Sequence, residues 1–145
     1  MTPSPACAAL IESFEGCRLT AYLPTPEDRW TIGWGETGPD ITQGTVWTQA
    51  AADASFARRL ASVGWSVESL VSPDTAQNQF DAMTSLAWNI GVGAFATSTL
   101  LRLHNAADYE LVPPQFLRWD TQGGKVLGGL RRRRQAEAAM YRGAP

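Results

Sequence analysis

The chain has 145 residues, of which 44% are hydrophobic and 18% charged, a composition that excludes a disordered or fibrous protein. No stretch approaches the roughly 20 apolar residues that span a bilayer, so we expect no stable membrane insertion. The formal net charge is −2, but residues 1–57 carry two bases and seven acids, whereas residues 115–145 carry seven bases and two acids.

The first predicted element is a helix with Ser4 as its N-cap and Pro5 at its first position, where a missing N–H costs nothing. Its apolar residues have the spacing of one buried helical face: Cys7, Leu10, Ile11 and Phe14. Gly16 is expected to end the helix in the left-handed conformation, so Glu15 is the last residue before the stop.

The pattern then alternates between apolar and polar residues, as in β-strands. Residues 19–23 and 30–34 alternate in this way, and a run of turn-forming residues, 24–28, separates them. This arrangement predicts a β-hairpin.

The rest of the chain is predicted to be helical. A long helix should begin after Thr48 and end at Ser72 and Pro73, although Gly64 weakens it by roughly 1 kcal/mol relative to alanine. Further helices are expected over about residues 75–90, after Ser98, and over about residues 127–141.

These elements predict an α+β fold in a single domain of 145 residues. Residues 15–47 form a small hairpin lobe, and residues 48–72 form a connecting helix. Residues 73–145, together with the N-terminal helix, form a mainly α-helical lobe.

Two cysteines, Cys7 and Cys17, are too few for a disulfide framework and are expected to be packing residues. No cluster of His and Cys has metal-ligand spacing, so we expect neither a metal nor another cofactor. The single histidine, His104, lies among leucines, which argues against a catalytic triad. The six tryptophans are expected mostly in the core, with Trp34 the best candidate for contact with a ligand.

Glu15 is the most suggestive residue. A carboxylate at a helix C-terminus faces the negative end of the helix dipole, which favours the protonated form that a general acid needs. On this evidence alone, a solvated surface glutamate is the commoner interpretation.

Three segments of the chain carry a more specific signal. They are Glu15-Gly16-Cys17-Arg18-Leu19-Thr20-Ala21-Tyr22 with Trp30-Thr31-Ile32-Gly33-Trp34-Gly35, Trp88-Asn89-Ile90-Gly91-Val92-Gly93-Ala94-Phe95, and Gly129-Leu130-Arg131-Arg132-Arg133. In this order they resemble the phage-type lysozymes, the endolysins of glycoside hydrolase family 24. The resemblance covers about residues 8–142.

The resemblance implies a lysozyme-like fold and hydrolysis of the β-1,4 bond between N-acetylmuramic acid and N-acetylglucosamine in peptidoglycan. Glu15 matches the general acid of the family, and Thr31 matches the threonine that helps to position the attacking water. Tyr22, Trp34 and Gly35 are the expected substrate-binding residues.

One family residue is missing. The family has an aspartate, sometimes a cysteine, shortly after the tyrosine that matches Tyr22, and here Pro24 or Thr25 stands in that place. Thr31 alone, Asp28 or Glu27 of the turn, or Glu36 are the alternatives for positioning water. A solvent-exposed turn is the simpler interpretation of residues 27 and 28.

The run from Arg131 to Arg134 is the most basic feature of the chain. Four consecutive helical positions sweep most of the circumference, so at least one arginine should pack against the protein. Glu137 is placed to pair with Arg133. The other arginines are candidates for docking on an anionic cell wall, whereas a nucleic-acid partner is not expected at a net charge of −2.

The sequence therefore predicts an endolysin muramidase that acts on peptidoglycan glycan strands as a monomer. The alternative is a catalytically impaired peptidoglycan-binding protein of the same fold, which the missing aspartate suggests. The N-terminus lacks the pattern of a signal peptide. We therefore expect the protein to stay in the host cytoplasm until a holin opens the membrane to periplasmic peptidoglycan.

Overall fold

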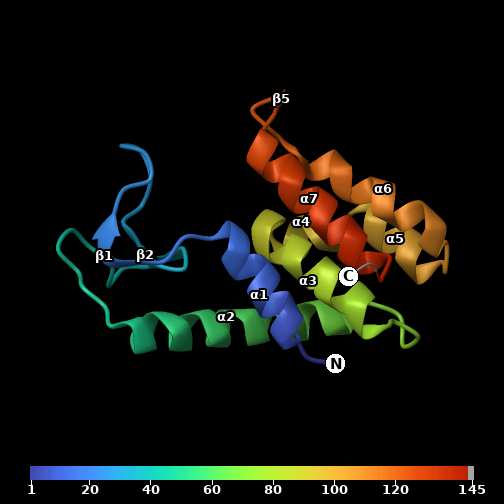
Figure 1. Ribbon diagram of the computed structural model, residues 1–145, viewed down its shortest axis with the longest axis horizontal. Coiled ribbons are helices and arrows are strands. Elements are labelled where there is room, and N and C mark those ends of the chain that lie inside the picture. The colour runs from blue at the N-terminus through green and yellow to red at the C-terminus, as the bar shows by residue number, and fades with distance from the viewer. Residues whose placement is uncertain (144–145) are drawn as a thin grey trace.

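The computed structural model describes residues 1–143 and has the predicted α+β architecture. Two short antiparallel sheets accompany the helices in that part of the chain. The first sheet lies near one end of the long helix α2, and the helices α3 to α7 gather beyond its other half (Figure 1).

Helix α1 (Pro5–Phe14) begins as predicted, because the Ser4 side chain accepts a hydrogen bond from the backbone N–H of Cys7. Its end differs from the prediction. Gly16 does not adopt the left-handed conformation; the helix stops because Glu15 takes extended backbone angles, φ −96° and ψ 130°. Only Cys7 and Ile11 of the expected apolar face are fully buried, and Phe14 is 37% exposed.

The predicted hairpin is present, in a shorter form, as β1 (Arg18–Tyr22) and β2 (Thr31–Gly33). A third strand, β3 (Glu36–Thr37), extends this sheet beyond the prediction. The segment before α2 also pairs with β1, since the backbone N–H of Trp47 donates to the Leu19 carbonyl at 2.8 Å. The sheet buries Ala21, Ile32 and Ile41 in a small core of its own.

Helix α2 (Gln49–Leu70) has the predicted cap, because the Thr48 side chain accepts a hydrogen bond from the Ala51 N–H. Packing against the N-terminal segment explains the glycine at position 64, which the helix pattern alone did not explain. A β-carbon there would lie 2.5 Å from Cγ of Pro3, so the glycine lets the N-terminal segment cross the helix. Trp65 contradicts the expectation of a core position, since it is 76% exposed.

The helical lobe contains α3 (Gln77–Ile90), α4 (Val92–Ala96), α5 (Thr99–Asn105), α6 (Val112–Phe116) and α7 (Gly128–Tyr141). Single turns of 3-10 helix flank α6, at Tyr109–Leu111 and Leu117–Trp119. A second, unpredicted hairpin, β4 (Thr121–Gln122) and β5 (Lys125–Val126), leads into α7. Phe80, Met83 and Leu86 of α3 lie at the centre of the main core.

Candidate active site

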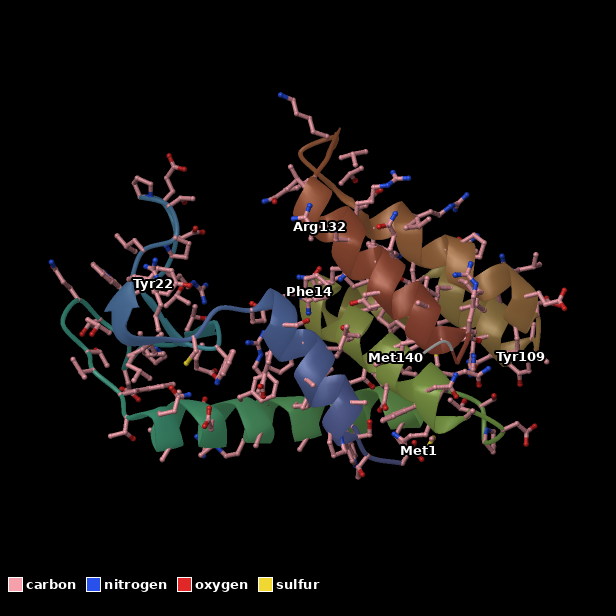
Figure 2. All side chains as sticks on the ribbon, viewed as in Figure 1. Met1, Phe14, Tyr22, Tyr109, Arg132 and Met140 are labelled. Atoms are coloured by element: carbon pink, nitrogen blue, oxygen red, sulfur yellow. The ribbon has the colours of Figure 1, made fainter. Side chains whose placement is uncertain are left out.

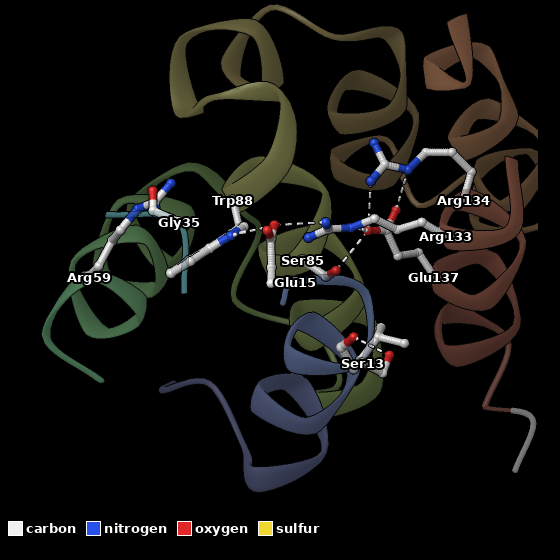
Figure 3. A network of polar contacts seen from close by, with 10 residues as sticks. Ser13, Glu15, Gly35, Arg59, Ser85, Trp88, Arg133, Arg134 and Glu137 are labelled. Atoms are coloured by element: carbon white, nitrogen blue, oxygen red, sulfur yellow. Dashed lines mark hydrogen bonds and ion pairs between the residues drawn. The ribbon is translucent and has the colours of Figure 1, made fainter. Parts of the chain in front are cut away.

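The Glu15 carboxylate lies where α1 ends, between α3, α7 and the turn after β2 (Figure 3). Its Oε1 atom accepts a hydrogen bond from Trp88 Nε1 at 3.3 Å and one from Arg133 Nη1 at 3.0 Å. Its Oε2 atom lies 3.7 Å from the position that a β-carbon would take at Gly35. The side chain is 26% exposed, so the carboxylate is held on one oxygen and accessible at the site.

Arg59 of α2 supports the site from the side of the sheet. Its Nη1 donates to the Gly35 carbonyl at 3.5 Å, and its guanidinium lies over the Trp88 ring, 4.0 Å from the ring centroid. Both residues that touch Arg59 also lie against Glu15 (Figure 3). Arg59 thus connects the turn after β2 to the helical lobe.

Thr31 starts β2 and pairs with Tyr22 of β1 in the sheet register. The Thr31 side chain is buried, and its hydroxyl donates to the Arg29 carbonyl at 2.9 Å. Since that bond uses the hydroxyl proton, the lone pairs of the oxygen remain free to accept. The Tyr22 ring lies beneath the Arg18 guanidinium, 4.3 Å from its carbon, and Figure 2 shows Tyr22 well away from Phe14.

Trp34, a predicted substrate-binding residue, turns toward α2. Its indole N–H donates to Asp53 at 2.9 Å, and its ring packs near Phe56, with 5.9 Å between the ring centroids. The hydrogen bond from Trp34, with a second from Gln49, lowers the pKa of the Asp53 carboxyl. The polar atom of Trp34 is therefore already engaged within the protein.

The two candidate substitute carboxylates lie in different surroundings. Glu36 is half-buried in β3 and accepts a 2.6 Å hydrogen bond from the hydroxyl of Ser55 on α2. Asp28 is exposed in the hairpin turn, where it accepts a hydrogen bond from Thr25 at 2.9 Å. Pro24 is exposed in the same turn, which agrees with a solvent-exposed loop at that point.

Reasoning from the sequence missed the two residues that bond Glu15. Arg133 and Trp88 are 118 and 73 residues away along the chain. The arginine run carried part of the signal, since at least one of its members was expected to be buried and paired. Arg133 also lines a groove of about 620 Å³ with Phe14, Leu127 and Arg132, beside Glu15.

Within residues 1–143, no helix is both long and apolar enough to cross a membrane. In the same residues, no group of three or more His, Cys, Asp or Glu side chains is placed to hold a metal ion.

Comparisons with known proteins give consistent matches. The family model described as phage lysozyme matches residues 12–137. An endolysin of Acyrthosiphon pisum secondary endosymbiont phage 1 is 40% identical over 93% of this chain and 94% of its own length. The endolysin of Bacillus phage B103 is 37% identical over 97% of this chain. The chain spans about half the length of that protein and of the next curated relatives it matches.

A solved structure agrees with this result. The muramidase domain of SpmX from Asticaccaulis excentricus superposes with a TM-score of 0.85 at 36% sequence identity, and the match covers 95% of each chain.

Proposed function

The chain belongs to the phage lysozyme family, and from that premise we propose that it is an endolysin muramidase. Its reaction is hydrolysis of the β-1,4 bond between N-acetylmuramic acid and N-acetylglucosamine in peptidoglycan. Relatives named endolysin and a structure named as a muramidase domain support this reaction.

The observation that carries the proposal is the asymmetric setting of the Glu15 carboxylate. Two N–H donors occupy Oε1, whereas Oε2 faces Gly35, a residue without a side chain. A proton on Oε2 can therefore be delivered to a glycosidic oxygen that enters beside Gly35. Such delivery is the task of a general acid in glycoside hydrolysis.

The same reaction needs a water molecule that attacks the anomeric carbon as the glycosidic bond breaks. We assign its positioning to Thr31, because the Thr31 oxygen is free to accept a hydrogen bond from that water. Tyr22, Trp34 and Gly35 remain the proposed substrate contacts. Of the alternatives, Glu36 is bonded to Ser55 and Asp28 lies in the exposed turn.

The test of the function is Glu15→Gln, with Glu12→Gln on the same helix as the matched control. We expect Glu15→Gln to keep the circular dichroism spectrum of the parent and to lose at least about 10²-fold in the clearing of outer-membrane-stripped cells. Among residues 1–143, Glu12 forms no hydrogen bond or ion pair through its carboxylate, so its variant should clear cells at the parent rate. Equal rates in all three proteins would remove Glu15 from the mechanism.

The absence of the family aspartate, where Pro24 or Thr25 stands, favours a second candidate, a wall-binding protein of the same fold with impaired turnover. The two candidates differ in one measurement. The enzyme releases new reducing ends from purified peptidoglycan, whereas the binding protein sediments with the peptidoglycan and releases none.

We also propose how the protein reaches the cell wall. It acts as a monomer and reaches periplasmic peptidoglycan from the host cytoplasm after a holin opens the membrane. Expression with and without a holin tests this route. Lysis of the culture without a holin would contradict it.

A further inference from the structure

A buried polar cluster lies directly behind the Glu15 site. It consists of Arg133, Arg134 and Glu137 of α7 and Ser85 of α3, and Figure 3 shows it continuing from Glu15. Arg133 contacts both carboxylates, since its Nη1 is 3.0 Å from Glu15 Oε1 and its Nε is 3.5 Å from Glu137 Oε1. Glu15 and Glu137 therefore share one guanidinium.

Glu137 is the most firmly held residue of this cluster. It is fully buried and accepts hydrogen bonds from Ser85 Oγ at 2.7 Å and from Arg134 Nη2 at 3.0 Å. Arg134 Nε also lies 2.8 Å from Glu137 Oε2, close enough for an ion pair although not aligned as a hydrogen bond. Arg133 has little room to move, because its side chain is only 5% exposed.

Burial raises the pKa of the Glu137 carboxyl and lowers that of Arg134, and the two groups partly offset each other. Arginine keeps its proton at every accessible pH, so the two guanidinium groups favour the ionised form of Glu137 against the effect of burial.

Other titratable groups lie on the elements packed around this cluster. The Cys7 thiol of α1 stays neutral because burial raises its pKa to about 12. Asp81 of α3 is engaged by Ser4 and Gln77. On the other side of Glu15, Arg59 of α2 is stacked on Trp88 and bonded to Gly35.

We propose that Glu137 is a positioning residue for the reaction, which rests on the proposed function of Glu15. Glu137 holds the Arg133 guanidinium against Glu15 and offsets one of the two positive charges of the arginine pair. Glu15 therefore faces a cluster with one net positive charge and not two. The cluster orients Oε1 and sets the charge that Glu15 faces.

The charge balance makes opposite predictions for two substitutions. Glu137→Gln removes the negative charge, so the positive charge near Glu15 increases and protonation of Glu15 requires a lower pH. Arg134→Gln removes a positive charge, so protonation of Glu15 occurs at a higher pH. A purely structural role would destabilise both variants without displacing their titrations in opposite directions.

The experiment follows the indole N–H signal of Trp88 by NMR across pH, because Trp88 donates directly to Glu15. Glu15→Gln identifies the signal, since its titration should disappear there. We expect the midpoint to fall by at least about half a pH unit in Glu137→Gln and to rise in Arg134→Gln. The alkaline limb of kcat/KM for peptidoglycan should move in the same two directions.

Ser85→Ala is the matched control, because it removes a hydrogen bond to Glu137 and no charge. Its midpoint should stay near that of the parent. An unchanged or raised midpoint in Glu137→Gln overturns the proposal. If Glu137→Gln does not fold, the Arg134→Gln variant is the test, and a midpoint there that does not rise overturns the proposal. If the parent releases no reducing ends yet the Trp88 midpoints of the two variants move as stated, the proposed function fails, whereas the control of the charge at Glu15 by Glu137 is supported.

Discussion

The two carboxylate oxygens of Glu15 have different surroundings. Oε1 is held by donors from α3 and α7, and Oε2 faces the backbone of Gly35. A carboxylate fixed through one oxygen keeps its orientation while the other oxygen exchanges a proton, which is the geometry that acid catalysis requires. The proposed role of Glu15 thus depends on the space beside Oε2, which the backbone of Gly35 leaves open.

Gly35→Ala tests whether the open space beside Glu15 Oε2 is needed, because it adds a single carbon atom there. Gly35 has φ +100°, which side-chain-bearing residues rarely adopt, and the new methyl group would lie 3.7 Å from Glu15 Oε2. We expect a strain cost of about 1–3 kcal/mol and a loss of activity in the folded fraction, which reducing-sugar release measures. Gly38→Ala, with no atom near its β-carbon position, is the control. Full activity in Gly35→Ala would show that the space beside Oε2 is not used.

Thr31→Ala tests the positioning of water. If the Thr31 oxygen orients the attacking water, its loss should raise the activation barrier by about 2–4 kcal/mol, as for other preorganised polar contacts. Asp28→Asn and Glu36→Gln should stay within a few-fold of the parent, because these carboxylates are bonded to Thr25 and Ser55. The rates are compared on one peptidoglycan preparation. A large loss in Glu36→Gln with little effect at Thr31 would transfer the role to Glu36.

At the scale of an element, α7 places its four consecutive arginines in two different surroundings. Arg133 and Arg134 are buried and paired with carboxylates. Arg131 and Arg132 are exposed, and Arg131 also forms an ion pair with Asp120 at 3.4 Å. The reason is helical geometry, because adjacent positions point about 100° apart and cannot all face one side. Of these four arginines, we propose the two exposed ones for contact with an anionic wall.

Replacing Arg131 and Arg132 with glutamine should therefore flatten the salt dependence of wall binding. Raising the salt to physiological strength shortens the Debye length to about 8 Å and weakens attraction between exposed charges. Co-sedimentation with purified walls at several salt concentrations measures the effect. The control removes two exposed arginines from other helices, Arg58 and Arg102. If the control variant gave the same flattening, net charge alone would explain the binding.

At the scale of the whole molecule, His104 joins three separate segments of the helical lobe. It belongs to α5, its Nε2 lies 2.8 Å from the Thr75 hydroxyl, and its Nδ1 lies 2.6 Å from the hydroxyl of Tyr141 on α7. The ring is fully buried, and burial lowers its pKa below the usual 6.5. This residue is a structural connector and not a member of the candidate site.

This lowered pKa predicts how stability depends on pH. Between the pKa of His104 in the folded protein and 6.5, the unfolded chain binds more protons, so stability falls as the pH falls through that range. The contribution is complete above about pH 6.5. Since the chain has one histidine, a single imidazole NMR signal reports the pKa directly. His104→Gln should show a shallower decline in urea midpoint between pH 7 and pH 5, and an equal decline would contradict the prediction.

The sequence alone determined the features that depend on neighbouring residues. Thr48 and Ser98 cap their helices as predicted, and Gly91 ends α3 with φ +95°, because capping and left-handed glycine are local effects. The three segments around Glu15, Trp88 and Arg131, taken in order, indicated the family that the comparisons confirm. The expected pairing of Arg133 with Glu137 was also local, one helical turn apart, and it is present.

Only the tertiary structure decided what depends on segments far apart in the chain. Arg133 reaches Glu15 across 118 residues, Gly64 makes room for Pro3, and Ser55 engages Glu36. It also placed Trp65 outside the core, although tryptophan is usually mostly buried. Propensity and periodicity describe one element at a time, whereas a paired charge depends on the packing of several elements. The partners of Glu15 were therefore decided when α1, α3 and α7 packed together.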